Sequence, residues 1–356
     1  MMLSRTIMLG MLVALTPIQV KLWSQTKGVQ GELDTVTAQG IALLVDGSAV
    51  PRVIPWYDLK QVEPSNTNTE RFAPFADRAW RAHTRIDRGD FDGALPLYES
   101  MRDAYLWEIG PQSMDIGIGL KRCLISQQQR TQAIEPALSW FVSAKLHNLE
   151  SSVAEPSVDP QTMLHIDLPP IMIESSKSQV LAELPESLNR TDRERLLFAY
   201  FRLVHEGVNR QELIVERIDQ LKRSLRARDP GIVLMEQMAF AQAHPETSRR
   251  IAAQDALRRR TQTQHDTWIE VWSRLALGSA LLRESDPIKQ DEGVIELLHV
   301  VVRLSDIDTN LTMTAAEIAA GHLKATNRAQ WADQIMQDAR NHITNPNASQ
   351  EYLSND

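Results

Sequence analysis

Hydrophobic positions recur with a helical period over most of the chain. Beyond Phe72, apolar residues return at intervals of three and four, which is the spacing of one face of an α-helix. Turn signals such as Gly89-Asp90 and Asp229-Pro230-Gly231 separate the periodic segments. We therefore expect amphipathic helices over residues 74–88, 91–107, 113–127, 130–147, 192–206, 209–227, 231–243, 246–262, 265–283, 290–304, 313–324 and 328–342.

A shorter period precedes the helices. Between residues 31 and 62, apolar residues alternate or form short runs, such as IALLV at 41–45, which Asp46-Gly47 follows. Asp-Gly between two such runs is typical of a β-hairpin. The pattern predicts a small β module of three or four strands at 31–62, joined to the helices by a polar linker at 63–71. Because about 32 residues bury little core alone, we expect the module to pack on the rest of the chain or on another chain.

A proline-rich stretch at 148–191 divides the helical region. Its five prolines disfavour a helix, so we expect a linker between two helical lobes or an extended strap laid across them. The apolar run MLHIDLPPIMI at 163–173 favours the strap. The predicted plan is a helical lobe at 72–147, a second helical lobe at 192–343 and a disordered tail at 344–356.

Residues 1–25 have the pattern of an export signal. A short positive start precedes the apolar run TIMLGMLVAL at 6–15, which Pro17 interrupts. The run is shorter than the ~20 residues of a membrane-spanning helix. We expect a cleaved signal peptide; the alternatives are an uncleaved anchor extending through Val20 and Leu22, or a buried N-terminal helix. The predicted location is the periplasm or the outer side of the inner membrane, with membrane contact only through this segment.

Charge and cysteine content narrow the classes of partner. The chain has 38 Lys and Arg against 46 Asp and Glu, a net charge of −8, so no broad cationic surface is available for phosphates. We therefore do not expect nucleic acid as a main partner. The single cysteine, Cys123, excludes an intramolecular disulfide and a cysteine-rich zinc site. It lies on an apolar helix face, where we expect it to be buried.

Two segments repeat one spacing of small residues. Ala82 and Ala94 are twelve positions apart with Gly89 at the turn between them, and Ala320 and Ala332 are again twelve apart. Small residues at facing positions let two antiparallel helices approach closely. The scheme resembles a tetratricopeptide repeat, which implies a mainly α fold of antiparallel helical pairs stacked as a solenoid behind the small β module. Helical hairpins of other solenoid or bundle families are the alternative.

The resemblance also implies a binding surface. In tetratricopeptide proteins the first helix of each pair lines a groove, so Ala79, His83 and Ile86 would face a protein or peptide ligand. The alternative is that these residues pack on the neighbouring pair.

The β segment carries a second, shorter resemblance. The run DGSAVPRVIPWYDLKQV is similar to the small SH3-like or Sm-like barrels found after export signals in some bacterial proteins. Trp56 and Tyr57 are expected to close the core of this module, and an exposed recognition platform is the alternative.

The usual signatures of catalysis are missing from the sequence. There is no GxxxxGK[ST], GxGxxG, HExxH, GxSxG or CxxC, so we assign no catalytic or cofactor-binding residue. The neighbouring pairs His205-Glu206 and His265-Asp266 point about 100° apart on a helix, and we expect them to be solvated surface pairs.

One loop has the spacing of a calcium site. Oxygen-bearing side chains occupy positions 1, 3, 5 and 12 of an EF-hand-like loop: Asp306, Asp308, Asn310 and Glu317. Leu311 stands where the loop needs glycine. The alternative is that Thr314 and Glu317 form a capping box for the next helix. Calcium is the one cofactor candidate that the sequence offers.

These patterns favour an exported, non-catalytic scaffold or adaptor that uses its helical repeats to bind a protein or peptide. One alternative is an envelope enzyme, a hydrolase or lyase with dispersed carboxylates in a helical cavity. Another is a structural subunit of an envelope assembly, which would make its contacts through an exposed strand edge of the β module.

Overall fold

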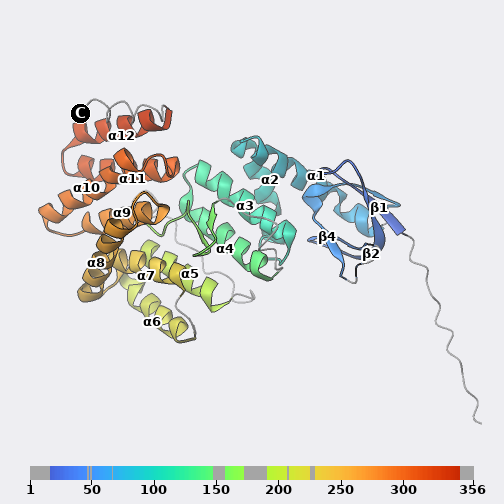
Figure 1. The fold of residues 1–356 in the computed structure, drawn as a ribbon, viewed down its shortest axis with the longest axis horizontal. Coiled ribbons are helices and arrows are strands. Elements are labelled where there is room, and N and C mark those ends of the chain that lie inside the picture. Colours follow the sequence, from blue (N-terminus) through green and yellow to red (C-terminus); the bar gives the residue numbers. More distant parts are fainter. Residues whose placement is uncertain are drawn as a thin grey trace, which may run out of the picture. The chain divides into compact units, whose positions relative to one another are not determined.

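The chain folds as a mainly α protein with a small N-terminal β module, as the sequence predicts (Figure 1). The computed structural model describes residues 17–45, 48, 50–65, 67–146, 157–171, 191–206, 208–224 and 229–344. The chain divides into two compact units, Met1–Leu120 and Lys121–Asp356, and the division falls within helix α3 (Pro111–Ser126). Among the described residues, no helix has the length and apolar content to cross a membrane.

Five strands of the first unit form one antiparallel sheet in the order β4-β3-β2-β1-β5. They are β1 (Pro17–Leu22), β2 (Val29–Thr37), β3 (Gly40–Leu44), β4 (Arg52–Ile54) and β5 (Leu59–Glu63), with a 3-10 turn, η1 (Trp56–Asp58), before β5. Asp46-Gly47 lies outside the described residues, but β3 and β4 on either side of it do pair. Strands β1 to β4 follow one another as a meander, and β5 pairs with the other edge of β1.

The sheet begins earlier than the sequence analysis expects. Ile18, Val20 and Leu22 alternate toward the core of β1, so residues 17–22 belong to the module rather than to the predicted leader. An anchor extending through Val20 and Leu22 is therefore wrong, because β1 pairs with β2 and β5. The linker is also shorter than 63–71, since helix α1 begins at Thr67. Residues 1–16 lie outside the described residues.

An aromatic cluster attaches the sheet to helix α1 (Thr67–Asp87). Trp56 is fully buried, donates a hydrogen bond from Nε1 to the Thr37 carbonyl (3.0 Å) and stacks on Phe72 of α1 at 4.8 Å. Tyr57 stacks on His83 of the same helix at 4.7 Å. Trp56 thus closes the core as predicted, and the exposed platform is wrong because α1 covers it.

Polar bonds join the module to the start of α3. The Gln39 carboxamide accepts a hydrogen bond from Ser113 N (3.0 Å) and donates one to Ser113 Oγ (3.1 Å). Tyr57 N donates to Gln112 Oε1 at 3.1 Å. The Gln39 and Gln112 side chains therefore accept hydrogen bonds from the backbone N–H groups of Ser113 and Tyr57.

Helix α2 (Phe91–Tyr105) packs against α1 as the first helical pair. Gly89 adopts φ +74° in the turn between them, a conformation that favours glycine. Asp90 caps α2 by accepting a hydrogen bond from Gly93 N at 3.0 Å. Ala82 and Ala94 are both fully buried, as the repeat spacing requires.

The second unit continues as a series of helices: α4 (Arg130–Leu146), α5 (Asp192–His205), α6 (Val208–Ser224), α7 (Pro230–Ala243), α8 (Thr247–Thr263), α9 (Trp268–Leu281), α10 (Pro287–Arg303), α11 (Thr309–Ala325) and α12 (Ala329–Thr344). Helices α5, α7, α9 and α11 contact one another in succession, and we call them the inner helices. Their partners α6, α8, α10 and α12 are the outer helices. Helices α9 and α11 each contact both helices of the preceding pair, and the succession runs from yellow to red in Figure 1.

Small residues lie where paired helices cross. Ala320 and Ala332 are buried between α11 and α12. At the α9–α10 crossing, a Cβ on either Gly278 or Gly293 would lie 2.9 Å from the carbonyl oxygen of the other. The twelve-residue spacing does not reveal this contact, because the α9–α10 turn is longer than the turns of the two repeat copies.

Residues 157–171, the middle of the proline-rich stretch, form a segment that we call the strap. It contains a short hairpin of β6 (Val158–Asp159) and β7 (Leu164–His165). The rest of the predicted stretch at 148–191, like most of the predicted tail at 344–356, falls mainly outside the described residues.

We expect Ala94→Leu and Ala332→Leu each to lower the free energy of unfolding by about 1 to 3 kcal/mol, because three carbons are added at a close helix crossing. Ala325→Leu, at an exposed position of α11, is the control and should change it by no more than about 0.5 kcal/mol. Urea denaturation measures the effect. Equal midpoints for all three variants would show that the alanines do not mark close crossings.

Candidate functional site

The strap lies along the inner helices, which hold its backbone. One side chain from each of α5, α7 and α9 donates a hydrogen bond to a strap carbonyl. The bonds run from Arg193 Nη2 to Thr162 O (2.6 Å), from Gln242 Nε2 to Pro170 O (2.8 Å) and from Trp272 Nε1 to Ile166 O (2.7 Å). Side chains therefore take the place of a neighbouring strand in satisfying these carbonyls.

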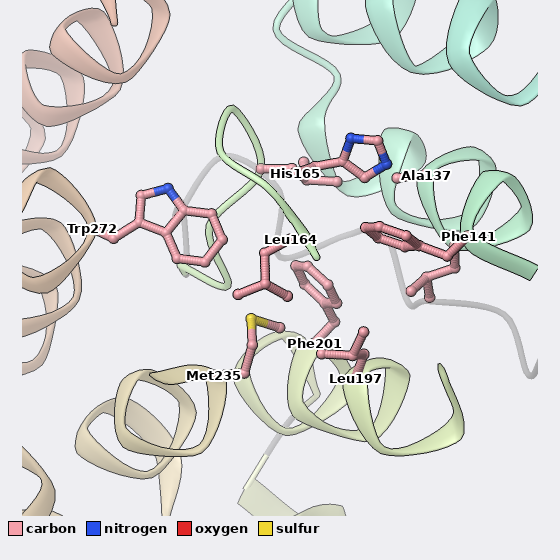
Figure 2. A pocket seen from close by; sticks show the side chains of 10 residues that line it. Ala137, Phe141, Leu164, His165, Leu197, Phe201, Met235 and Trp272 are labelled. Carbon is pink, nitrogen blue, oxygen red and sulfur yellow. The ribbon is translucent and has the colours of Figure 1, made fainter. Parts of the chain in front are cut away.

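Apolar strap residues fill the space above the inner helices. Leu164, Leu168 and Ile171 are buried, with 3 % or less of each residue exposed. Figure 2 shows Leu164 between Met235 and Trp272. The apolar cavity left beside it has a volume of about 20 Å³, which is room for about one water molecule. The strap thus packs with little empty space against α4, α5, α7 and α9 at this cavity.

The buried ammonium group of Lys121, in the second half of α3, binds side chains of the strap. The fully buried Lys121 donates from Nζ to Asp167 Oδ2 (2.7 Å) and Ser157 Oγ (2.5 Å), and lies 3.3 Å from His165 Nδ1. Burial, and then the charge of Lys121, lower the pKa of His165 well below its ordinary value of 6.5. The imidazole is therefore neutral at pH 7, and its Nδ1 can accept a hydrogen bond from the ammonium.

Ser157 beside Lys121 raises the question of nucleophilic catalysis. In a Ser–Lys arrangement, a neutral amine takes the proton from the serine hydroxyl. Here the Asp167 carboxylate lies 2.7 Å from Lys121 Nζ and favours the charged ammonium, which has no lone pair to accept a proton. The geometry supports a structural ion pair and not a catalytic base.

The strap's contacts bear on whether a ligand can bind the inner helices. A partner at the inner faces of α5, α7 and α9 would first have to displace the buried Leu164, Leu168 and Ile171 and separate Asp167 from Lys121. The chain itself already occupies this part of the inner surface.

The groove residues implied by the tetratricopeptide resemblance differ in exposure. Ala79 and Ile86 are buried within the first unit, which favours the packing alternative for these two residues. His83 stacks on Tyr57, and its Nδ1 lies 2.6 Å from Oδ1 of Asp115 on α3, while its side chain stays 38 % exposed.

His83 and Asp115 form a partly buried charge pair in the first unit. Burial alone would lower the pKa of His83, but the hydrogen bond and charge of Asp115 raise it above 6.5. Burial raises the pKa of Asp115, and His83 and then Tyr98 act against that rise. Asp87 also lies 3.7 Å from His83 Nε2. Carboxylates therefore face both ring nitrogens, an arrangement that stabilises the imidazolium.

The calcium candidates do not form a loop. Asp306 lies in the turn before α11 and Asp308 caps that helix, accepting a hydrogen bond from Leu311 N at 2.9 Å. Asn310 and Glu317 are inside the helix, so the twelve-residue loop does not exist. In the described part of the chain, no three His, Cys, Asp or Glu side chains gather where they could hold a metal ion.

The capping-box alternative for this loop is also wrong. The helix begins at Thr309, so Thr314 lies within it and donates a hydrogen bond to Asn310 O at 2.8 Å. Burial raises the pKa of Glu317, and the positive charge of Arg130 on α4 acts against that rise. Arg130 acts on Asp308 in the same way, so a guanidinium already supplies positive charge to both carboxylates.

Two further polar predictions have different outcomes. Glu206 is buried and bonded to Arg202 at 2.6 Å, and burial lowers the pKa of His205 to about 4, so this pair is not solvated as expected. His265 is exposed, in agreement with the prediction, and Cys123 is buried as predicted. The sequence pattern could not distinguish the two histidines, because both stand beside an acidic residue.

An open hollow of the second unit lies on the other side of α7. We call it the outer groove, and its volume is about 400 Å³. It is lined by Val233, Glu236, Gln237 and Phe240 of α7 and by Arg249, Ala252, Ala253 and Ala256 of α8. At 100° per residue, the α7 members lie opposite Met235, which faces the strap. The volume falls within the range of about 300 to 1,000 Å³ that is typical of binding sites.

Polar side chains at the outer groove are held in place. Glu236 accepts a hydrogen bond from Lys222 Nζ at 2.6 Å, and Arg249 lies 3.3 Å from Glu246 and 3.8 Å from Asp219. The floor is apolar, while one carboxylate and one guanidinium are fixed among its lining residues. Such a hollow suits an apolar group carried on a polar backbone.

We expect Lys121→Met to lower the free energy of unfolding by about 3 to 5 kcal/mol, because Asp167 is left buried without its counter-charge. Lys121→Met combined with Asp167→Asn should recover part of the loss. Lys324→Met is the control, since its ion pair with Asp333 is exposed and contributes less than about 1 kcal/mol. Chemical denaturation of the three variants tests this, and a loss for Lys121→Met no greater than the control would refute the buried-pair assignment.

We expect the protonated His83 to stabilise the fold in a pH-dependent way. Its folded pKa is raised, so the stabilisation is complete below pH 6.5 and is lost as the pH rises through the folded value. Asp115→Asn should lower the pKa of His83, because burial is then opposed only by the charges of Asp87 and Asp58. NMR titration of the His83 ring measures the shift, with the ring of the exposed His265 as internal control. An unchanged His83 titration would contradict the pairing.

Comparison with known proteins gives no further guide to this site. No protein-family description, no curated protein and no solved structure matches the chain. The function is therefore argued from the geometry of the chain alone.

Proposed function

We propose that this protein is an exported, non-catalytic scaffold or adaptor that binds a protein partner through the outer groove between α7 and α8. The observation that carries the proposal is the groove itself, a hollow of about 400 Å³ with an apolar floor and fixed charges among its lining. A groove of this kind accepts an apolar side chain from a helix or an extended segment of another protein.

The arrangement of the helices supports a tetratricopeptide-like repeat. Successive inner helices pack side by side, and α9 and α11 each contact both helices of the pair before. Buried small residues at the α1–α2 and α11–α12 crossings agree with the repeat spacing. The order of the five strands, with a 3-10 turn before the last, is likewise compatible with an SH3-like module.

The partner surface that we propose differs from the one that the resemblance implies. The inner helices, which would line the groove of a tetratricopeptide protein, are covered by the strap. Because the strap already occupies the inner faces of α5, α7 and α9, we assign the partner to the outer surface.

Export remains part of the proposal. It depends on the apolar run at 6–15, which lies outside the described residues. Since β1 begins at Pro17 and is an inner strand of the sheet, removal of a signal before that residue would leave the module whole.

The alternative functions receive less support. An enzyme acting through paired carboxylates needs them in one cavity, yet the strap cavity is lined by apolar residues and His165, and the outer groove contains a single carboxylate, Glu236. A structural subunit that docks through a strand edge would have to use β4 or β5. Edge strand β4 has only three residues and lies between Pro51 and Pro55, which limits the hydrogen bonds that it can offer.

Site-specific photocrosslinking in the cells that make the protein tests the outer groove. With benzoylphenylalanine in place of Ala252, we expect a discrete heavier adduct, because this alanine is exposed within the groove. The same probe at Ala329, an exposed position on α12, is the control and should not give that adduct.

A second substitution makes the experiment specific. Ala256→Trp fills the groove and should abolish the adduct at 252, while circular dichroism checks that the helices are unchanged. An adduct that persists in the filled groove, or that appears equally at 329, would refute the groove as the partner site.

A further inference from the structure

Two arginines lie beside one end of the outer groove. Ala256 is the last α8 residue that lines the groove, and Arg259 and Arg260 follow it one helical turn later. At about 100° per residue, Arg259 lies about 60° to one side of Ala256 and Arg260 about 40° to the other. Arg259 is exposed and Arg260 is partly exposed. Both guanidinium groups are therefore within reach of a segment that lies in the groove.

A neutral side chain holds Arg260 at the groove wall. Its Nε donates a hydrogen bond at 2.6 Å to Oε1 of Gln237, which lines the groove on α7. Burial lowers the pKa of Arg260, and no described carboxylate acts against that fall. Burial also lowers the pKa of Arg130, but three carboxylates raise it again. Arg260 is thus a partly buried cation without a counter-charge.

The other charged side chains of α7 and α8 are engaged within the chain. The ion pairs are Lys222 with Glu236, Arg249 with Glu246 and Asp219, and Arg258 with Asp255 and Glu292. Arg250, near the start of α8, donates to the carbonyl oxygens of His244 and Pro245. Arg259 and Arg260 form no ion pair with a described residue. The uncompensated charge beside the groove is therefore positive, and it lies at one end.

A carboxylate is the group that this end of the groove fits. A guanidinium forms charge-assisted hydrogen bonds with carboxylates, and two of its N–H groups can bind one carboxylate together. Because Gln237 engages only Nε, the Nη1 and Nη2 groups of Arg260 are left for such a contact. A nucleic acid fits less well, since the floor of the groove is apolar and the chain carries a net charge of −8.

We infer that the outer groove takes a helix of a partner protein that carries a large apolar residue and, three or four residues from it, an Asp or Glu. This inference rests on the proposed function and names the chemistry of its partner. The apolar side chain lies on the alanine floor, and the carboxylate meets Arg259 and Arg260. Three or four residues of a helix span about 5 to 6 Å, which matches the step along α8 from Ala256 to the two arginines.

Selection from a library of random twelve-residue peptides tests the inference. The peptides are joined to a phage coat protein through their carboxyl ends, so acidic side chains and not a terminal carboxylate are offered to the immobilised full chain. Groove binders are those that bind the natural protein but not Ala256→Trp. We expect them to be enriched, relative to the unselected library, in Asp or Glu three or four residues from a large apolar residue.

The selection separates the two proposals. Groove binders without the acidic enrichment would overturn this inference and leave the outer groove as the partner site. An absence of groove binders would count against both the groove and its acidic partner.

Fluorescence anisotropy with one selected peptide measures what the arginines contribute. Arg259→Gln combined with Arg260→Gln should weaken binding about 10-fold or more, because charge-assisted hydrogen bonds are lost. Arg88→Gln combined with Arg303→Gln removes the same charge at exposed positions outside α7 and α8, and this control should change the affinity less than about 2-fold. Equal losses in the two double variants would overturn the inference.

A change in the peptide shows whether the contact is direct. Replacement of its acidic residue by Gln should weaken binding to the natural protein but not to the Arg259→Gln, Arg260→Gln variant. A scrambled peptide of the same charge should bind the natural protein at least 10-fold more weakly. Equal binding of the scrambled peptide would show general attraction of anions and contradict a defined acidic partner.

Discussion

The structure of the second unit depends on the seating of the strap against the inner helices. Helices α7 and α9 are apolar around nearly their whole circumference, so a single covering layer of outer helices would leave them half exposed. The strap supplies the other layer. Its carbonyls accept hydrogen bonds from inner-helix side chains, and its Asp167 carboxylate pairs with the buried Lys121 ammonium. An extended segment can be buried here because its polar groups are satisfied.

The same arrangement determines which surfaces remain available. The two surfaces that the family resemblances suggest for ligands, the inner face of the helical pairs and the aromatic end of the β module, are both covered by other parts of the chain. Helix α1 covers Trp56, and the strap covers the inner helices. An open groove instead remains between α7 and α8.

Most of the charged side chains that suggest chemistry serve the fold. His83 pairs with Asp115, and Lys121 pairs with Asp167. The positive charge of Arg130 interacts electrostatically with the carboxylates of Asp308 and Glu317. In each case a buried charge is compensated by an opposite one, which is what burial demands whether or not a site has a function.

The sequence by itself determined where the helices and the sheet lie. The helical period identified each segment, and twelve-residue spacing located Ala94 and Ala332 at helix crossings, because periodicity and residue size are local properties. The start of the sheet was missed, since the alternation of Ile18, Val20 and Leu22 directly follows a leader-like apolar run. Only the tertiary structure decided that Lys121 and Glu206 are buried, that Asp308 rather than Thr314 caps α11, and that the strap covers α5, α7 and α9. These outcomes depend on which distant elements pack together. Local periodicity in the sequence shows which face of a helix is apolar, but it does not show which distant segment covers that face.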